Sequence, residues 1–272
     1  MSKLLESIDV HSTWKKDEVF YNQIIELLEG NKQLIGIENE IGPSCSYTPR
    51  KEKVLRFFET NLEEICVVIL GQDPYPQAGV ATGRAFEVGN ISTWRDHTSQ
   101  TSLINIIKSI YKMEKDIAEK KDVKEKDVKI SEIRNEIEND NFNINLSIEC
   151  WFNNLKEQGV LFLNTAFTCE IDGKPNSHRT HWEDFTITII NHIITKRPDC
   201  TWLIWGNNAK KIMEKCKDTK KYKSPHPVNA SFYKVDNCFK KTKKIIKTKN
   251  GKPIDWLGNA PSKINSHKKE SK

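Results

Sequence analysis

Apolar residues in this chain gather in short continuous runs that alternate with longer segments of mixed character. Continuous apolar runs stand at 66–71, 159–167 and 200–206, and a shorter stretch begins at 222. The segments between them repeat apolar residues at helical spacing, over residues 102–116, 151–158, 181–196 and 207–215. Buried runs separated by helices are typical of a parallel sheet covered on both faces. The pattern therefore predicts an α/β fold with a mostly parallel sheet flanked by helices, in a single domain over residues 1–256.

The remaining segments carry weaker patterns. Residues 14–65 are predicted to be mainly helical, and the segment 18–30 ends at a glycine that suits a helix end. Residues 79–89 are predicted to form a loop with a short strand at its end. Residues 115–140 are almost all charged, which predicts a solvated helical or partly disordered insertion. The basic stretch 257–272 is predicted to be a disordered tail, whose best functional role is non-specific attraction to phosphates.

Polar side chains stand where three of the predicted strands end. Gln72 and Asp73 follow the run "VVILG", Asn164 ends "LFLN", and His226 stands in "SPHPVNAS". Open α/β sheets bind ligands at the carboxyl ends of their strands, so these residues could form a pocket with a base and an amide. Each also has an ordinary explanation, as a turn residue or as a satisfied surface or core histidine. Taken one by one, the residues leave both explanations open.

Two prolines bracket Tyr75 in "GQDPYP". Each proline ring fixes its own φ and restricts the residue before it. Gln72 and Asp73 are therefore expected to be held rigidly at the end of the strand.

Composition narrows the class of protein. The seven cysteines contain no CxxC pair, which argues against a zinc ribbon, an iron–sulfur cluster or a disulfide framework. No signal segment or long apolar span is visible, so we expect a protein of a reducing compartment that does not enter a membrane. The expected location is the cytoplasm, or the nucleus or a viral factory if the source is eukaryotic or viral.

Positive charge is concentrated near the C-terminus. The net charge is +6, and residues 203–272 hold 19 Lys against 5 Asp or Glu. A basic field of this kind favours polyanionic partners such as nucleic acid. A genome of low GC content would also make the protein rich in lysine, so charge alone does not decide the function.

The motifs "GQDPYP", "GRAFEV", "LFLNT", "NSHRTHWEDFT", "LIWGNNAKK", "HPVNAS" and "GKPIDW" occur in an order that resembles the family 1 uracil-DNA glycosylases. The resemblance covers roughly residues 65–256, apart from the charged insertion. It implies a four-stranded parallel sheet between helices, no metal and no cofactor. It also implies hydrolysis of the uracil–deoxyribose bond in DNA, which leaves an abasic site for base excision repair.

The resemblance assigns the pocket that would bind the base. Enzymes that act on a base in DNA take it out of the stack. Phe86 would stack on the extruded uracil, the amide of Asn164 would pair with N3–H and O4, and the backbone of Gln72 would shape the pocket. Tyr75 would stand against C5 and exclude thymine by a clash, since an extra methyl group is poorly rejected by attraction alone.

The resemblance also assigns the chemistry to two residues. Asp73 would stay ionised, orient the attacking water and stabilise the positive charge that develops on the sugar. His226, in its neutral form, would donate a hydrogen bond to O2 of the departing uracil anion. The residues do not decide whether Asp73 acts chiefly as a base or as an electrostatic partner.

The residues expected to contact the DNA depart from the family pattern. By resemblance these are Ser102, Asn207, Ala230, Ser231 and Phe232. Ala230 stands where a leucine wedge is usual, Asn207 and Val228 replace phosphate-binding serines, and Pro76 replaces a histidine. A small wedge predicts a preference for single-stranded substrates, unless Phe232 serves as the wedge instead.

Three functions are therefore compared. The favoured one is an active, monomeric uracil-DNA glycosylase whose partners are uracil-containing DNA and a DNA-mimicking inhibitor protein. The alternatives are a non-catalytic DNA-binding or processivity protein on the same scaffold, and a glycosylase for a different lesion. Retention of Asp73, Asn164 and His226 together favours catalysis, because a pure binder would have little need for all three.

Overall fold

The computed structural model describes residues 2–39, 46–119, 128–234 and 237–259. By their contacts the residues divide into two compact units. Unit 1 consists of Met1–Asn90 and Leu161–Lys223, and unit 2 consists of Ile91–Val160 and Ser224–Lys272. The predicted domain bounds, 1–256 followed by a tail, stay a prediction.

A four-stranded parallel sheet with the strand order β3-β2-β5-β6 organises the fold. Its strands are Val160–Leu163 (β3), Val67–Leu70 (β2), Thr201–Trp205 (β5) and Lys221–Ser224 (β6). Every residue of β2, β3 and β5 is buried, which explains their continuous apolar runs. β6 is partly exposed and lysine-bearing, as suits an edge strand. The predicted α/β fold class is confirmed.

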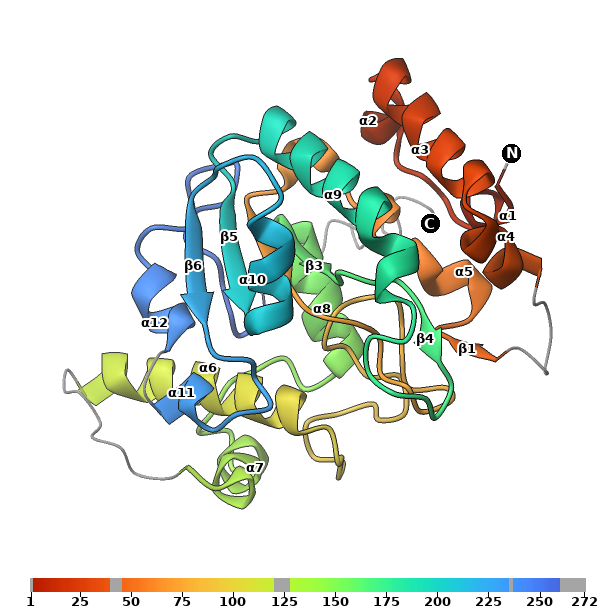
Figure 1. The fold of residues 1–272 in the computed structure, drawn as a ribbon. Helices are drawn as coiled ribbons and strands as arrows, with labels where there is room; N and C mark the ends of the chain where they lie inside the picture. Colours follow the sequence, from red (N-terminus) through yellow and green to blue (C-terminus); the bar gives the residue numbers. More distant parts are fainter. Residues whose placement is uncertain (1, 40–45, 120–127, 235–236, 260–272) are drawn as a thin grey trace, which may run out of the picture. The chain divides into compact units, whose positions relative to one another are not determined.

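The helices of unit 1 include the long segments that the sequence predicted. α3 (Glu18–Gly30) packs against α4 (Lys32–Asn39) and α9 (Arg179–Lys196), and α10 (Asn207–Met213) packs against β5 (Figure 1). The other elements of this unit are short: α1 (Lys3–Glu6), α2 (Ser12–Lys15), β1 (Tyr47–Thr48), α5 (Lys51–Val54), the 3-10 turns Arg56–Glu59 (η1) and Leu62–Glu64 (η2), and β4 (Cys169–Glu170). The antiparallel pair of β1 and β4 was not predicted, because two-residue strands leave no period to detect.

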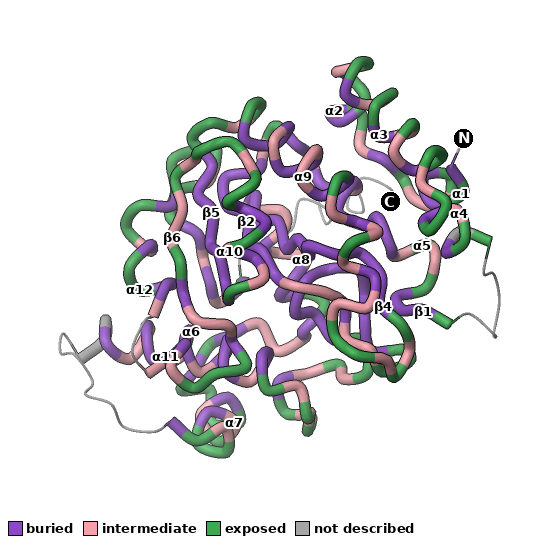
Figure 2. Tube along the Cα trace, viewed as in Figure 1, coloured by how far each residue is buried: buried purple, intermediate pink, exposed green. Residues whose placement is uncertain are grey.

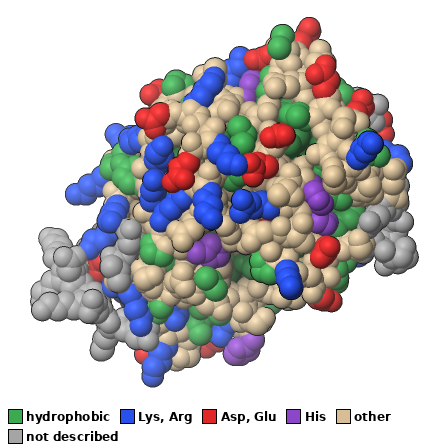
Figure 3. Space-filling model, viewed as in Figure 1, with side chains coloured by type: hydrophobic (Ala, Val, Ile, Leu, Met, Phe, Trp, Pro, Cys, Tyr) green, Lys and Arg blue, Asp and Glu red, His purple; other side chains and the backbone are tan. Residues whose placement is uncertain are grey.

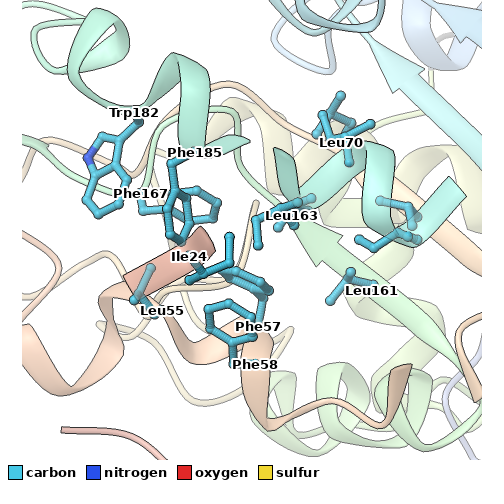
Figure 4. Packing of buried hydrophobic residues seen from close by; sticks show 14 of the residues in the cluster. Ile24, Leu55, Phe57, Phe58, Leu70, Leu161, Leu163, Phe167, Trp182 and Phe185 are labelled. Carbon is cyan, nitrogen blue, oxygen red and sulfur yellow. The ribbon is translucent and has the colours of Figure 1, made fainter. Parts of the chain in front are cut away.

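Aromatic rings fill much of the core of unit 1 (Figure 4). The ring of Phe167 lies 5.1 Å from that of Phe57 and 5.1 Å from that of Trp182, measured between centroids. Leu70 and Leu163 extend the same core to the ends of β2 and β3. The burial drawn in Figure 2 follows this pattern, with β2 and β5 buried along their length. The strand ends that carry the polar residues are therefore anchored in a densely packed interior.

Unit 2 is built around α6 (Thr101–Glu119), which contacts α7 (Ile130–Glu138), α11 (Ser231–Lys234) and α12 (Cys238–Thr242). α8 (Ile148–Glu157) adds Trp151, whose indole N–H donates to the carbonyl of Trp256 at 2.9 Å. In the described residues no helix is long and apolar enough to cross a bilayer. The six cysteines that the structure describes are all free thiols.

Three predictions about irregular segments need correction. The helical part of the expectation for the charged insertion 115–140 is confirmed, because α6 reaches Glu119 and α7 spans Ile130–Glu138. The correction is that α7 buries Ile133 and Ile137, so it is packed rather than merely solvated. Residues 120–127 lie outside the described residues. The expected strand near residue 88 is reduced to an isolated bridge between Ala81 and Val88.

The third correction concerns the start of the tail. Asn154 donates its amide hydrogen to the carbonyl of Gly258 at 2.7 Å, and Asn145 donates its backbone N–H to the carbonyl of Leu257 at 2.8 Å. Residues 257–259 therefore belong to the folded structure of unit 2. Residues 260–272 lie outside the described residues.

His192 is a buried titratable group in the core of unit 1. Its ring stacks on Phe20 at a centroid distance of 3.5 Å, and it is 8% exposed. Burial lowers the pKa of His192 to about 4, and the charge of Lys196 adds to this effect while that of Asp17 opposes it. The folded protein therefore holds this ring neutral.

We predict that acid destabilises the fold partly through His192. Between pH 6.5 and pH 4 the His192 ring is protonated in the unfolded chain but stays neutral in the folded chain. The free energy of unfolding therefore decreases as the pH falls through this range. From pH 7 to pH 4.5 the free energy of unfolding of the wild type should fall by about 2 kcal/mol more than that of His192→Phe, which keeps a ring but cannot titrate. Urea unfolding at both pH values measures the difference. Parallel losses in the two proteins would contradict the assignment.

Candidate active site

The ends of β2 and β3 are joined through the backbone of Gln72. Its carbonyl oxygen accepts hydrogen bonds from the N–H groups of Thr165 and Ala166 at 2.9 and 3.0 Å, and from the Thr165 hydroxyl at 2.7 Å. The N–H of Gly71 also donates to the carbonyl of Leu163 at 2.8 Å. These bonds place the polar residues that follow the two strands beside each other. The predicted convergence of Asp73 and Asn164 at one sheet edge agrees with this arrangement.

Asp73 is a half-buried carboxylate with a fixed orientation. Its Oδ2 accepts the backbone N–H of Asn176 at 2.6 Å. Burial raises the pKa of Asp73, and hydrogen bonds from the Asn176 backbone and the Gln72 side chain oppose that rise. Burial therefore disfavours the charged form of Asp73, while hydrogen bonds favour it. Opposing effects of this kind on one carboxylate are typical of residues with a chemical role.

The side chains of Asn164 and Phe86 lie next to the backbone of Gly71. Asn164 is 4% exposed and Phe86 is 8% exposed. A side-chain carbon added to Gly71 would lie 2.8 Å from Oδ1 of Asn164 and 3.1 Å from Cε2 of Phe86. The missing side chain of Gly71 therefore leaves these two groups free to approach the backbone closely. An amide edge beside an aromatic face is the arrangement that can read and stack on a planar base.

Phe86 adopts an unusual backbone conformation, with φ at +68°. This left-handed region is disfavoured for a bulky residue, so the surrounding structure must hold it there. The next residue, Glu87, is 2% exposed and is bound by Arg84 at 3.3 Å and by Arg56 at 3.2 Å. Because this carboxylate is buried and paired twice, the loop that presents Phe86 is rigidly anchored.

Tyr75 is partly buried between Pro74 and Pro76. Its hydroxyl lies 3.5 Å from the carbonyl oxygen of Phe86, and burial raises the pKa of the phenol. The carbonyl of Pro74 accepts the thiol hydrogen of Cys169 at 3.3 Å, which ties the loop to β4. Tyr75 is thus held next to the loop that presents Phe86.

His226 belongs to unit 2 and follows β6 by two residues. Its Nδ1 accepts the backbone N–H of Val228 at 3.1 Å, and burial lowers the pKa of the imidazole. A neutral ring with Nδ1 as acceptor carries its proton on Nε2, where it can donate. Asn105 of α6 donates to the carbonyl of Pro227 at 2.6 Å and so fixes the loop that follows.

The residues expected to contact DNA differ in how far they are exposed. Asn207 and Ala230 are exposed, at the start of α10 and before α11. Ser231 is half-buried, and Ser102 is buried near the start of α6. Phe232 is 0% exposed and packs edge-on against Phe239 at 6.5 Å, so the expectation that it could act as the wedge is corrected. A ring enclosed in the core of unit 2 cannot enter a base stack.

Three residues of the site were not predicted as functional: Asn176, Asn208 and Gly71. Asn176 stands in the quoted motif "NSHRTHWEDFT", and its position before a helix was the available signal. Asn208 donates to the side-chain oxygen of Gln72 at 2.7 Å, a contact that no local pattern reveals. Among the described residues, no cluster of three or more His, Cys, Asp or Glu is placed to hold a metal ion. The prediction that the reaction needs no metal stays a prediction.

Basic side chains gather over α10 and β6 on the face drawn in Figure 3. Some are paired, as Lys215 is with Glu183 and Lys221 with Asp218. The C-terminal excess of lysine is therefore partly displayed on a surface of unit 1, where it favours polyanions.

Comparison with known proteins decides the family. Residues 57–248 match the model of the uracil DNA glycosylase superfamily. The uracil-DNA glycosylase of Fusobacterium nucleatum is 31% identical over 228 residues, covering 81% of this chain and 85% of that protein. The chain belongs to the uracil DNA glycosylase superfamily.

Solved structures agree on the fold of this glycosylase. The UNG of Nitratifractor salsuginis superposes with a TM-score of 0.68 at 21% identity, over 90% of this chain and 96% of that one. A mimivirus UNG variant in complex with UGI gives a TM-score of 0.62 at 20% identity, over 93% and 90% of the two chains. These two likenesses support the fold, and the family itself rests on the sequence matches.

We predict that Gly71→Ala impairs this glycosylase without unfolding it. The new methyl group would meet Asn164 at 2.8 Å and the Ala85 side chain at 3.0 Å, so the amide or the Phe86 ring must move. A misplacement of about 1 Å in a binding site can cost on the order of 10²-fold in rate, so we expect uracil release to slow by up to that factor. Steady-state uracil release and the thermal unfolding midpoint measure the two effects.

Gly36→Ala is the matched control for this prediction. Nothing lies within 4 Å of the carbon that would be added to Gly36, which is in α4. Its activity should equal that of the wild type. Equal activity in both glycine variants would show that the space beside Gly71 is not part of the site.

Proposed function

We propose that this chain hydrolyses the N-glycosidic bond of deoxyuridine in DNA, releasing uracil and leaving an abasic site. The observation that carries the proposal is the meeting of three features in unit 1. A buried amide (Asn164) and a half-buried carboxylate with a raised pKa (Asp73) follow the adjacent strands β3 and β2. The ring of Phe86, a residue with a strained backbone in the loop after β2, lies beside Gly71 at the same strand end. Uracil excision in DNA repair fits both this chemistry and the family.

Recognition of the base would rest on rigid groups. An extruded uracil would stack on Phe86, and the Asn164 amide would accept from N3–H and donate to O4. A methyl group at C5 would clash with Tyr75, whose flanking prolines prevent it from moving aside. Rejection of thymine would therefore come from repulsion rather than from a weaker attraction.

Bond cleavage would separate charge between the sugar and the base. As the bond from C1′ to uracil N1 breaks, its electrons pass to the base and the sugar becomes cationic. Asp73, in its ionised form, would stabilise the sugar and accept a proton from the attacking water. The Nε2–H of His226 would donate to O2 of the uracil anion. The hydrogen bond from Val228 to Nδ1 supports this role, because it fixes the tautomer that can donate.

Partners follow from the same reaction. The substrate partner is uracil-containing DNA, and a protein inhibitor is a second expected partner, since the mimivirus relative is bound to UGI. We further propose that the enzyme works as a monomer, because the reaction needs only groups of this chain. A location in the cytoplasm, or in the nucleus or viral factory of a eukaryotic or viral source, remains part of the proposal.

The decisive test measures cleavage at a single dU in a labelled oligonucleotide. We predict that the wild type releases uracil, and that Asp73→Asn lowers kcat by roughly 10²–10⁴-fold with little change in KM, because the general base is lost. Uracil release and alkaline strand cleavage are measured together. DNA binding without uracil release by the wild type would favour the non-catalytic DNA-binding protein instead.

The missing wedge generates a second prediction. Extruding a base costs a few kcal/mol, least in a single strand. With Phe232 buried, the exposed apolar side chains described in the loop after His226 are those of Val228 and Ala230, and alanine fills little of a vacated stack. We expect higher kcat/KM on single-stranded than on duplex dU, and Ala230→Leu should raise the duplex value by about tenfold, since burying a leucine yields about 1.5–3 kcal/mol.

Two variants test this account of the wedge. Ala230→Leu should leave the single-stranded value unchanged, because no stack has to be filled there. Val228→Ala serves as the comparison, since Val228 is 53% exposed in the same loop. A wild type that treats both substrates equally, with duplex activity lost in Val228→Ala, would move the wedge from position 230 to Val228.

A further inference from the structure

Asn208 bridges two residues that surround Asp73. It is the second residue of α10, and its Nδ2 donates to Oε1 of Gln72 at 2.7 Å. The same Nδ2 lies 3.4 Å from Oδ1 of Asn176, at the long end of the hydrogen-bond range. All four residues belong to unit 1. The role given to Gln72 in binding uracil uses its backbone, which leaves its side-chain amide without an assigned function.

The contact with Asn208 determines which way the Gln72 amide faces. A glutamine amide has an oxygen that only accepts and an NH₂ group that only donates. Because Oε1 is occupied by the Asn208 donor, the NH₂ group is the end left for Asp73. Hydrogen bonding from the Gln72 side chain is among the causes that lower the pKa of Asp73. A reversed amide would instead place an oxygen against that carboxylate, which is repulsive.

The second contact of Asn208 is with Asn176, whose backbone N–H donates to Asp73. Asn176 has φ at +67°, and its backbone N–H donates to Oδ2 of Asp73 at 2.6 Å. Asparagine tolerates this left-handed conformation better than most residues, yet the turn still has to be held. The contact with Asn208 adds to that restraint. One side chain thus touches both residues that donate to the carboxylate.

We propose that Asn208 is a positioning residue, which orients the Gln72 amide and the Asn176 turn so that both donate to the carboxylate of Asp73. It does not itself contact Asp73 in any hydrogen bond of the described structure. The proposal rests on the proposed function, in which Asp73 must be ionised to act. A residue that merely fastened α10 to the neighbouring loops would affect stability but not the titration of Asp73.

The test measures the titration of Asp73 in the wild type and in Asn208→Ala. Losing an oriented donor disfavours the charged form, so the pKa of Asp73 should rise by on the order of one unit. Carbon-13 NMR of the carboxyl group in the DNA-free protein measures this pKa and requires no turnover. In the dU assay the acid limb of kcat/KM should move to higher pH by the same amount, with KM changed less than about threefold.

A double-mutant cycle with Gln72→Leu tests whether the effect passes through the Gln72 amide. This change removes the amide and keeps the backbone carbonyl that joins β2 to β3. If Asn208 acts mainly through Gln72, adding Asn208→Ala to Gln72→Leu should move the pKa of Asp73 little further. Asn191→Ala is the control, because its amide lies on α9 and accepts from the Lys217 N–H, outside this network. It should leave the titration unchanged.

The outcomes separate this inference from the proposed function. An unchanged pKa of Asp73 in Asn208→Ala would overturn the positioning role. Fully additive shifts in the double mutant would overturn the part of that role that passes through the Gln72 amide and leave the contact with Asn176 as its basis. A wild type that releases no uracil, but in which the Asp73 pKa rises in Asn208→Ala, would overturn the proposed function and leave the positioning role supported.

Discussion

The carbonyl oxygen of Gln72 accepts three hydrogen bonds from the first two residues after Asn164, and this junction holds the ends of β2 and β3 together. A backbone oxygen has two lone pairs, and both lone pairs of this oxygen accept hydrogen bonds. Because its partners are backbone groups and one hydroxyl, the junction depends little on side-chain identity. It fixes Asp73 on one strand end and Asn164 on the next, while the packed core beneath β2 and β3 prevents either strand from sliding.

The residues around this junction adopt conformations or bury charges that cost free energy. Phe86 has a left-handed backbone, Asp73 is a carboxylate raised in pKa by burial, and Glu87 is a buried charge. Each would be unfavourable alone. Each is also tied to a partner: Glu87 to two arginines, and Asp73 to the Asn176 backbone and the Gln72 side chain. Such over-determined geometry suits a site that must bind a flat base and a developing cation without rearranging.

The sheet could be predicted from the sequence because β2, β3 and β5 are buried on both faces. Burial on both faces requires a continuous run of apolar residues, which is easy to recognise. The sequence also placed Asp73, Asn164 and His226 at strand ends, since local order along the chain carries that information. It could not predict Asn208, whose partner Gln72 is 136 residues away, because a long-range side-chain contact has no periodic signature. The packing of Ile133 and Ile137 was missed for a related reason: two apolar residues in a charged segment are too few to reveal a buried face.

Residues that would read the base and residues that would handle the DNA differ in how they are supported. Asn164 and Phe86 are buried in a unit whose core is continuous, so a change there disturbs packing as well as chemistry. Ala230 and Val228 lie in an exposed loop, where a side chain can change without unfolding anything. The departures that the resemblance indicates at Ala230 and Val228 fall in this second class. Substitutions in this loop can therefore change how the chain would contact DNA while they leave the packing around Asn164 and Phe86 intact.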